Sequence, residues 1–121
     1  MSNDFVKNVK VERELVNSIK AYISENYRND ITLDKLSQLY FISPSYLSYL
    51  FKLITGDSYS DYLKMTRLNN AKQLLESHPE MKVYEICFEV GYKEYKYFSI
   101  QFKNAFGFSP TSIKKEKRNK L

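Results

Sequence analysis

The chain has few of the residues that build metal sites, disulfide frameworks and turns. Its 121 residues include one cysteine, one histidine, no tryptophan, three glycines and three prolines. The single cysteine, Cys87, excludes an intrachain disulfide framework and a cysteine-rich zinc site, and makes a reducing, cytoplasmic compartment the expectation. The scarcity of glycine and proline argues against a β-rich or collagen-like chain.

Long hydrophobic runs and catalytic motifs are also absent. No stretch approaches ~18 apolar residues, and Met1 to Lys10 has no apolar signal segment, so the sequence predicts neither a membrane span nor a signal peptide. The one histidine, His78, precedes Pro79 without a second ligand at metal-binding spacing, and no glycine-rich phosphate loop occurs. The sequence therefore predicts no enzyme, no cofactor and no metal site.

Positive charge and apolar residues are plentiful. Lys and Arg number 19 against 14 Asp and Glu, which gives a net charge of +5 and a pI near 9.2. This excess favours a polyanionic partner. A hydrophobic fraction of 43% is enough for a core, in one domain or in two very small ones that share it.

Apolar spacing predicts an all-α chain of about seven helices. Thr32 and Ser43 are expected N-caps, Pro44 suits a first helical position, and His78-Pro79 ends a helix. Leu39, Tyr97 and Ala105 are among the residues expected in the core. The predicted helices cover approximately residues 11–26, 33–40, 44–55, 58–75, 83–90, 94–106 and 110–113.

A 13-residue segment occurs twice, 51 positions apart, as Tyr46–Ser58 and Tyr97–Ser109. Tyr, Ser, Phe, Lys, Gly and Ser recur in register. Gly56 and Gly107 stand where a helix ends in a residue of positive φ, so both are expected to stop the helix before them. The repeat indicates one supersecondary unit that is used twice.

Each half reads as a short helix, a tight turn and a second helix, which is a helix-turn-helix. Small residues, Ser37 and Cys87, stand where the helices cross. Phe41 occupies the first turn where Gly91 occupies the second, which predicts turns of different geometry. The expected organisation is a flexible N-terminus (1–11), a first helix-turn-helix subdomain (12–57), a linker helix (58–76), a second subdomain (77–115) and a basic C-terminal tail (116–121).

The second helix of each half leaves a matching face outside its predicted core stripe. Short polar side chains allow close approach to base edges in a major groove, and a lysine at the end of the face reaches phosphate. Tyr49 and Ile100 are large groups at equivalent outward positions and need a partner. The two faces are Ser45, Ser48, Tyr49 and Lys52 in the first half and Lys96, Ser99, Ile100 and Lys103 in the second.

Together these motifs resemble the AraC/XylS family of transcription regulators over roughly residues 12–115. The residues that carry the resemblance are Ser43 to Gly56, the apolar positions of the linker helix, Ile86 to Tyr92 and Tyr97 to Pro110. The family implies seven helices in two helix-turn-helix subdomains, which place two recognition helices in successive major grooves of double-stranded DNA. By position, it implies base contacts from Ser45, Ser48, Tyr49, Tyr95, Lys96, Ser99 and Ile100, and phosphate contacts from Lys52, Lys93 and Lys103.

Two departures from the family pattern bear on specificity. Tyr49 and Ile100 stand where family members often carry Arg, so a side chain that reads guanine with two hydrogen bonds is missing from both helices. We therefore expect an A·T-leaning site. Arg67 is interpreted as structural, through a carboxylate such as Glu85 or Glu94, with a phosphate contact as the alternative. Gly56, Gly91 and Gly107 are interpreted as structural as well.

Other classes of function stay open from the residues alone. Tyr49, Tyr95 and Ile100 could form the docking patch of a helical protein-interaction module, and an RNA-binding domain also fits the charge. The resemblance makes RNA polymerase a further candidate partner. It also implies an N-terminal sensing, dimerisation or receiver domain that residues 1–11 are too short to hold, so the chain is either a small regulator or a fragment of a larger one.

Overall fold

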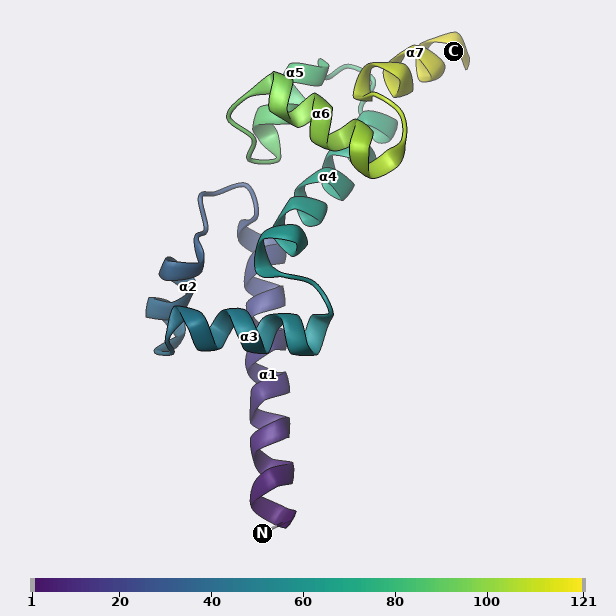
Figure 1. Cartoon of the computed structure of the whole chain (residues 1–121). Coiled ribbons are helices and arrows are strands. Elements are labelled where there is room, and N and C mark those ends of the chain that lie inside the picture. Colours follow the sequence, from purple (N-terminus) through teal and green to yellow (C-terminus); the bar gives the residue numbers. More distant parts are fainter. Residues whose placement is uncertain (1, 121) are drawn as a thin grey trace. The chain divides into compact units, whose positions relative to one another are not determined.

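The computed structural model describes the backbone of residues 2–120 and the side chains of residues 8–116. Within that range it has seven α-helices and no strand, which confirms the predicted all-α fold. The chain divides into two compact units, Met1–Leu63 and Lys64–Leu121. The helices are α1 (Ser2–Asn26), α2 (Leu33–Tyr40), α3 (Pro44–Thr55), α4 (Tyr59–Ser77), α5 (Val83–Glu89), α6 (Tyr95–Phe106) and α7 (Pro110–Lys120), as Figure 1 shows.

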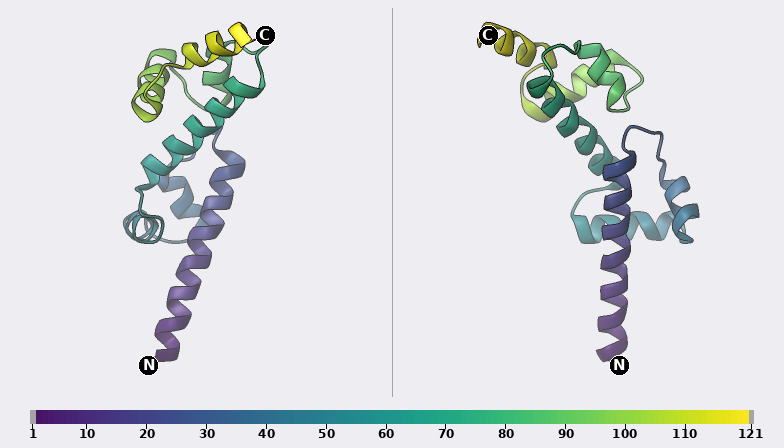
Figure 2. Two further views of the ribbon diagram at one scale, coloured as in Figure 1. Left: turned by 90° about the vertical axis from the view of Figure 1, so that its right-hand side faces the viewer. Right: turned by 180° about the vertical axis from the view of Figure 1, so that it is seen from behind.

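The first unit is built on α1. Helix α3 packs against both α1 and α2, and it crosses α1 steeply in Figure 1 and in the right panel of Figure 2. The core residues recur at the helical period on α1 and α3, which is why these segments fold as amphipathic helices. At the start of α4, the Tyr59 hydroxyl donates to the Ile31 carbonyl. The buried apolar side chains of the three helices include Val16, Ile19, Ile23, Leu36, Leu47, Leu50 and Phe51.

The second unit holds the rest of α4 together with α5, α6 and α7. Helices α5, α6 and α7 contact one another pairwise. Aromatic side chains contribute to its core, because Phe98 and Phe102 of α6 are both fully buried. The other buried side chains include Leu68, Ala71 and Leu75 of α4, Ile86 and Cys87 of α5, and Ile113 of α7.

The predicted helix signals are confirmed where they could be read from local chemistry. The Thr32 hydroxyl accepts from the Lys35 amide at 3.1 Å, and the Ser43 hydroxyl accepts from the Tyr46 amide at 3.2 Å. Gly56 and Gly107 end α3 and α6 with φ of 86° and 82°. A Cβ at these angles would be strained, so glycine is the residue that fits both stops.

Two helix boundaries were predicted wrongly. Helix α1 begins at Ser2 rather than near Val11, so the segment expected to be flexible is part of a helix. Helix α7 continues to Lys120 rather than ending near Ile113. Neither segment contains an internal glycine or proline, and strong helix formers such as Lys, Glu and Arg let a helix continue without an apolar stripe. Residues 1 and 121, at the ends of the two predicted tails, lie outside the described backbone.

Three residues predicted for the core are exposed. Leu39 and Tyr97 expose 50% and 53% of their surface, and Ala105 is exposed as well. The buried side of α2 is centred on Leu36 and Ser37, which turns Leu39 toward solvent. Leu39 and Ala105 lie in the last turn of their helices and Tyr97 in the first, where the core no longer covers each apolar position.

The two helix-turn-helix turns differ in geometry, as predicted, although each contains one residue in the left-handed region. Phe41 has φ of 59° and Gly91 has φ of 103°. The turns differ in length. Three residues, 41–43, separate α2 from α3, whereas five residues, 90–94, separate α5 from α6, so the second turn is two residues longer.

Candidate nucleic-acid interface

The outward face of α3 carries the four residues that the sequence singled out. Ser45, Ser48, Tyr49 and Lys52 are all exposed, and Tyr49 leaves 64% of its surface open. The opposite face of α3, through Leu47, Leu50 and Phe51, is buried in the core. Packing of the buried side of α3 therefore fixes the helix that carries this exposed face.

Contacts at both ends hold α3 in place. At its start, Ser43 caps the helix and the Tyr46 hydroxyl donates to Glu12 of α1 at 2.7 Å. Near its end, the Phe51 ring meets the rings of Tyr59 and Tyr62 edge to face, with centroids 6.0 and 5.1 Å apart. Such pairs contribute beyond their buried area and fix the rotation of the helix about its axis.

The outward face of α6 follows the same spacing with one difference. Lys96, Ile100 and Lys103 are exposed, whereas Ser99 is half-buried. Tyr95 keeps 38% of its surface open, and its ring lies 6.4 Å from that of Phe98. Three of the four residues predicted for this face are thus exposed, and the small Ser99 lies between them.

A chain of aromatic rings fixes α6 within the second unit. The ring of Tyr92 lies 5.2 Å from that of Phe98, and Phe102 meets Phe106 edge to face at 4.7 Å. Lys72 of α4 places its ammonium 5.1 Å from the Phe106 ring centroid. Burial raises the pKa of the Tyr92 phenol to about 12, and the nearby positive charge of Arg67 opposes part of that shift.

Arg67 is half-buried, in agreement with a structural position on α4. Neither of the expected partners, Glu85 or Glu94, makes an ion pair in the part of the chain whose side chains are described. The positive charge of Arg67 acts on the phenol of Tyr92, which lies in the turn before α6. Its structural role stays a prediction.

The lysines predicted to contact phosphate are exposed and unpaired. Lys52 and Lys103 lie in the last turns of α3 and α6, and Lys93 lies in the turn before α6. None of the three makes an ion pair within the described side chains. Their ammonium groups are therefore available to an external anion in both units.

The helix crossings contain the small buried residues that the sequence predicted. Ser37 is buried and its hydroxyl donates to the Asp34 carbonyl at 2.7 Å, and Cys87 is fully buried. Burial raises the pKa of the Cys87 thiol to about 11. A thiol that stays protonated is a small hydrophobic group and a poor nucleophile, so Cys87 acts in packing.

The described residues provide neither a metal site nor a membrane-spanning helix. No group of three or more His, Cys, Asp or Glu side chains there is placed to hold a metal ion. Within that same part of the chain, every helix is too short or too polar to cross a membrane.

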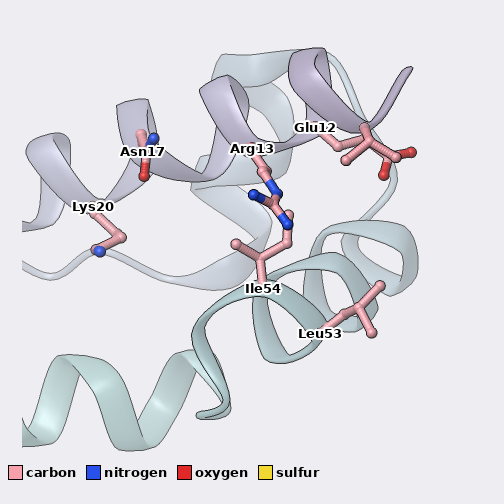
Figure 3. A pocket seen from close by; sticks show the side chains of 7 residues that line it. Glu12, Arg13, Asn17, Lys20, Leu53 and Ile54 are labelled. Atoms are coloured by element: carbon pink, nitrogen blue, oxygen red, sulfur yellow. The ribbon is translucent and has the colours of Figure 1, made fainter. Parts of the chain in front are cut away.

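A groove lies between α1 and α3, away from the residues predicted to contact DNA. Its volume is about 660 Å³, and Arg13 extends over Ile54 along it (Figure 3). The residues that line it are Val9, Glu12, Arg13, Asn17, Lys20, Leu53 and Ile54. None of the ten predicted base- and phosphate-contacting residues is among them.

Sequence reasoning missed two features of the interface. The bond between Tyr46 and Glu12 joins residues 34 positions apart, and no local pattern signals it. The second feature is the N-cap of α6, which is Glu94 and makes no side-chain capping bond. The rarity of Glu as an N-cap residue, compared with Ser, Thr, Asp and Asn, was a usable signal for it.

Known proteins resemble this chain in sequence and in structure. A family model described as a helix-turn-helix domain matches residues 36–116. The transcriptional regulatory protein HptR of Staphylococcus aureus (strain NCTC 8325 / PS 47) is 37% identical over 110 residues, which cover 89% of this chain and 43% of that protein. The chain spans about two fifths of the length of the curated relatives it matches.

Two solved structures share the fold. The C-terminal domain of AraT, a response regulator from Geobacillus stearothermophilus, matches with a TM-score of 0.80 and 34% identity, over 84% of each chain. A probable AraC family transcriptional regulator from Rhodopseudomonas palustris matches with a TM-score of 0.76 and 26% identity, over 85% of this chain and 96% of the other.

Proposed function

The chain belongs to the AraC-type family of helix-turn-helix transcription regulators, and on that premise we propose that it reads double-stranded DNA with α3 and α6 in successive major grooves. Sequence-specific DNA binding is the function of this domain in a family of transcriptional regulators, which is a non-enzymatic class. We propose that each of the two units contributes one of the helices that contact the bases.

The observation that carries the proposal is the pair of matched outward faces. Tyr49 and Ile100 occupy equivalent positions, 51 residues apart, and both are exposed although they are large and apolar or aromatic. Lys52 and Lys103 follow them at equivalent positions near the ends of the two helices. A DNA duplex would provide contacts for both faces. Base edges and thymine methyls would cover the two large side chains, and phosphates would contact the two lysines.

The length of α4 supports a two-groove arrangement. Its 19 residues make a helix roughly 28 Å long. Major grooves on one side of a duplex recur about every 34 Å, so a helix of this length suits a connection between two reading units. The proposed base contacts are Ser45, Ser48, Tyr49, Tyr95, Lys96, Ser99 and Ile100, and the proposed phosphate contacts are Lys52, Lys93 and Lys103.

The rest of the regulator is proposed from the same premise. The domain works in the bacterial cytoplasm, joined to a sensing, dimerising or receiver domain, and RNA polymerase is its protein partner at a promoter. The length of the relatives supports the additional domain, since each relative is more than twice as long as the segment that matches.

Selection of bound sequences from a pool of random duplexes tests the two-groove proposal. We expect two short preferred sub-sites with centres about 10.5 bp apart, one for each recognition helix. The Ile100→Ala and Tyr49→Ala variants should each change preference in a different sub-site. A single short site that only one variant alters would overturn it.

A further inference from the structure

Glu94 lies immediately before α6, at the surface predicted to contact DNA. Its polar side chain has no structural role there. Its backbone is extended, with φ of −135° and ψ of 123°, and its carbonyl accepts from the Phe98 amide at 3.1 Å as an N-cap should. Its side chain makes no capping bond. At the equivalent position before α3, the Ser43 hydroxyl is occupied by the Tyr46 amide.

The Glu94 carboxylate is also free of ion pairs. It is exposed, and no hydrogen bond or salt bridge reaches it from the described side chains. Its neighbours Lys93 and Lys96 are exposed and equally unpaired. A negative charge therefore stands at the edge of a lysine-bearing face, where phosphates of a bound duplex would repel it unless it met a hydrogen-bond donor.

The major groove offers such donors on two bases only. Base edges there present acceptors, the thymine methyl group, and the exocyclic amino groups of cytosine (N4) and adenine (N6). Residues at the start of a recognition helix are the ones that contact base edges. A carboxylate has acceptors alone, so its partner at that position is an amino group.

We propose that Glu94 is a specificity-determining residue that accepts a hydrogen bond from the exocyclic amino group of one base in the α6 sub-site. This inference rests on the proposed function, because it needs α6 in a major groove. The proposed contact would also give the longer second turn a function. Lys93 and Glu94 there follow Tyr92, whereas Ser43 alone follows the equivalent Ile42 in the first turn.

Selection from random duplexes with the wild-type chain and the Glu94→Ala variant tests the proposal. We expect wild type to discriminate at one base pair of the α6 sub-site by about fivefold or more, and Glu94→Ala to lose that discrimination while keeping the others. Glu80→Ala is the matched control. Glu80 is an exposed carboxylate in the same unit, so the variant makes the same change in net charge and should leave every preference unchanged.

Two further measurements separate base reading from folding and from the two possible bases. Glu94→Ser introduces a capping side chain and should melt no lower than wild type, yet it should also lose the base preference. A duplex with purine in place of adenine, or 2-pyrimidinone in place of cytosine, lacks only the amino group. The analogue of the base that is read should weaken wild type about fivefold and leave Glu94→Ala unaffected.

The outcomes are distinct. Identical preferences in wild type and Glu94→Ala overturn the inference, as does a uniform gain in affinity on all duplexes, which would mean that the carboxylate only repels phosphate. A wild-type chain that selects no sequence at all would overturn the proposed function itself.

Discussion

The hydroxyl of Tyr46 donates a hydrogen bond to the carboxylate of Glu12 at 2.7 Å, and this bond joins the first turn of α3 to the N-terminal half of α1. It joins α3, the proposed recognition helix of the first unit, to the helix on which that unit is built. Because the neutral phenol is the donor, the bond raises the pKa of Tyr46 above its ordinary value of 10.0.

Removal of the Glu12 carboxylate should lower the pKa of the Tyr46 phenol. In Glu12→Gln, the pKa of Tyr46 should fall toward 10.0, because the charged acceptor that favours the protonated phenol is gone. Titration of ring-labelled tyrosine by NMR measures this directly. Glu14→Gln changes an exposed carboxylate on the same helix and should leave Tyr46 unchanged; an equal fall in both variants would mean a general charge effect.

Phe41 should be replaceable by glycine with a gain in stability. It is held at φ of 59° while 94% of its surface is exposed, so it bears the steric cost of the left-handed region with little burial in return. We expect Phe41→Gly to raise the free energy of unfolding by about 1 kcal/mol, measured by urea denaturation.

The neighbouring exposed residue Leu39 provides the control for that change. Leu39 lies within α2, so Leu39→Gly should destabilise the chain by about 1 kcal/mol through helix propensity. Gly91→Ala, at the equivalent left-handed site with φ of 103°, should destabilise as well. A loss of stability in Phe41→Gly would contradict the strain argument.

The second unit should lose stability at alkaline pH. Burial raises the pKa of Cys87 from 9.0 to about 11 and that of Tyr92 from 10.0 to about 12. The unfolded chain therefore loses these protons at a lower pH than the folded chain does. The contribution to the free energy of unfolding is fully present below pH 9 and falls as the pH rises toward 12, by about 1.4 kcal/mol per pH unit for each titrating group. Thermal melts between pH 8 and 11 measure the decline.

Cys87→Ala isolates one of the two groups. The variant should melt lower at pH 8 because a small cavity is left, but its decline between pH 9 and 11 should be shallower than that of wild type. Parallel pH profiles in the two proteins would show that the thiol does not contribute.

The lysines proposed to contact phosphate should affect the salt dependence of DNA binding. Each of Lys52→Ala and Lys103→Ala should weaken binding to all duplexes by a similar factor and lower the slope of log affinity against log salt by about 0.9. Fluorescence anisotropy at several salt concentrations measures both. Lys20→Ala, in the groove between α1 and α3, should leave the slope unchanged.

Lys114 should stabilise the second unit by closing the end of α4. Its ammonium donates to the carbonyls of His78 and Pro79 at 3.0 and 2.8 Å, and the His78 carbonyl also accepts from the Met81 amide at 3.1 Å. We expect Lys114→Met to lower the free energy of unfolding by about 1 kcal/mol. Lys115→Met removes the adjacent, exposed lysine and should have no effect; equal losses would point to charge alone.

Local chemistry explains why most of the fold could be predicted. The caps at Thr32 and Ser43 and the stops at Gly56 and Gly107 depend on a residue and its nearest neighbours, and the structure confirms all four. The ends at Ser2 and Lys120 were missed because no stop signal and no apolar stripe marks them. Exposure of Leu39, Tyr97 and Ala105 depends on where the rest of the core ends.

In the candidate site too, spacing predicted some features and the packing of the helices decided others. Spacing alone placed Ser45, Ser48, Tyr49 and Lys52 on one exposed face of α3. Spacing did not reveal that Ser99 is half-buried or that the Glu94 side chain caps nothing, because both depend on how α6 is seated. Which bases these residues contact stays a prediction.

The sequence by itself determined that this is a duplicated helical chain with two matching polar faces, because helical period, caps and glycine stops are encoded within a few residues. The tertiary structure decided the rest. Contacts between residues distant in sequence bond Tyr46 to Glu12, place Lys114 over the end of α4 and set the charge of Arg67 near Tyr92. Such contacts form only once the helices are packed, and no local pattern specifies them.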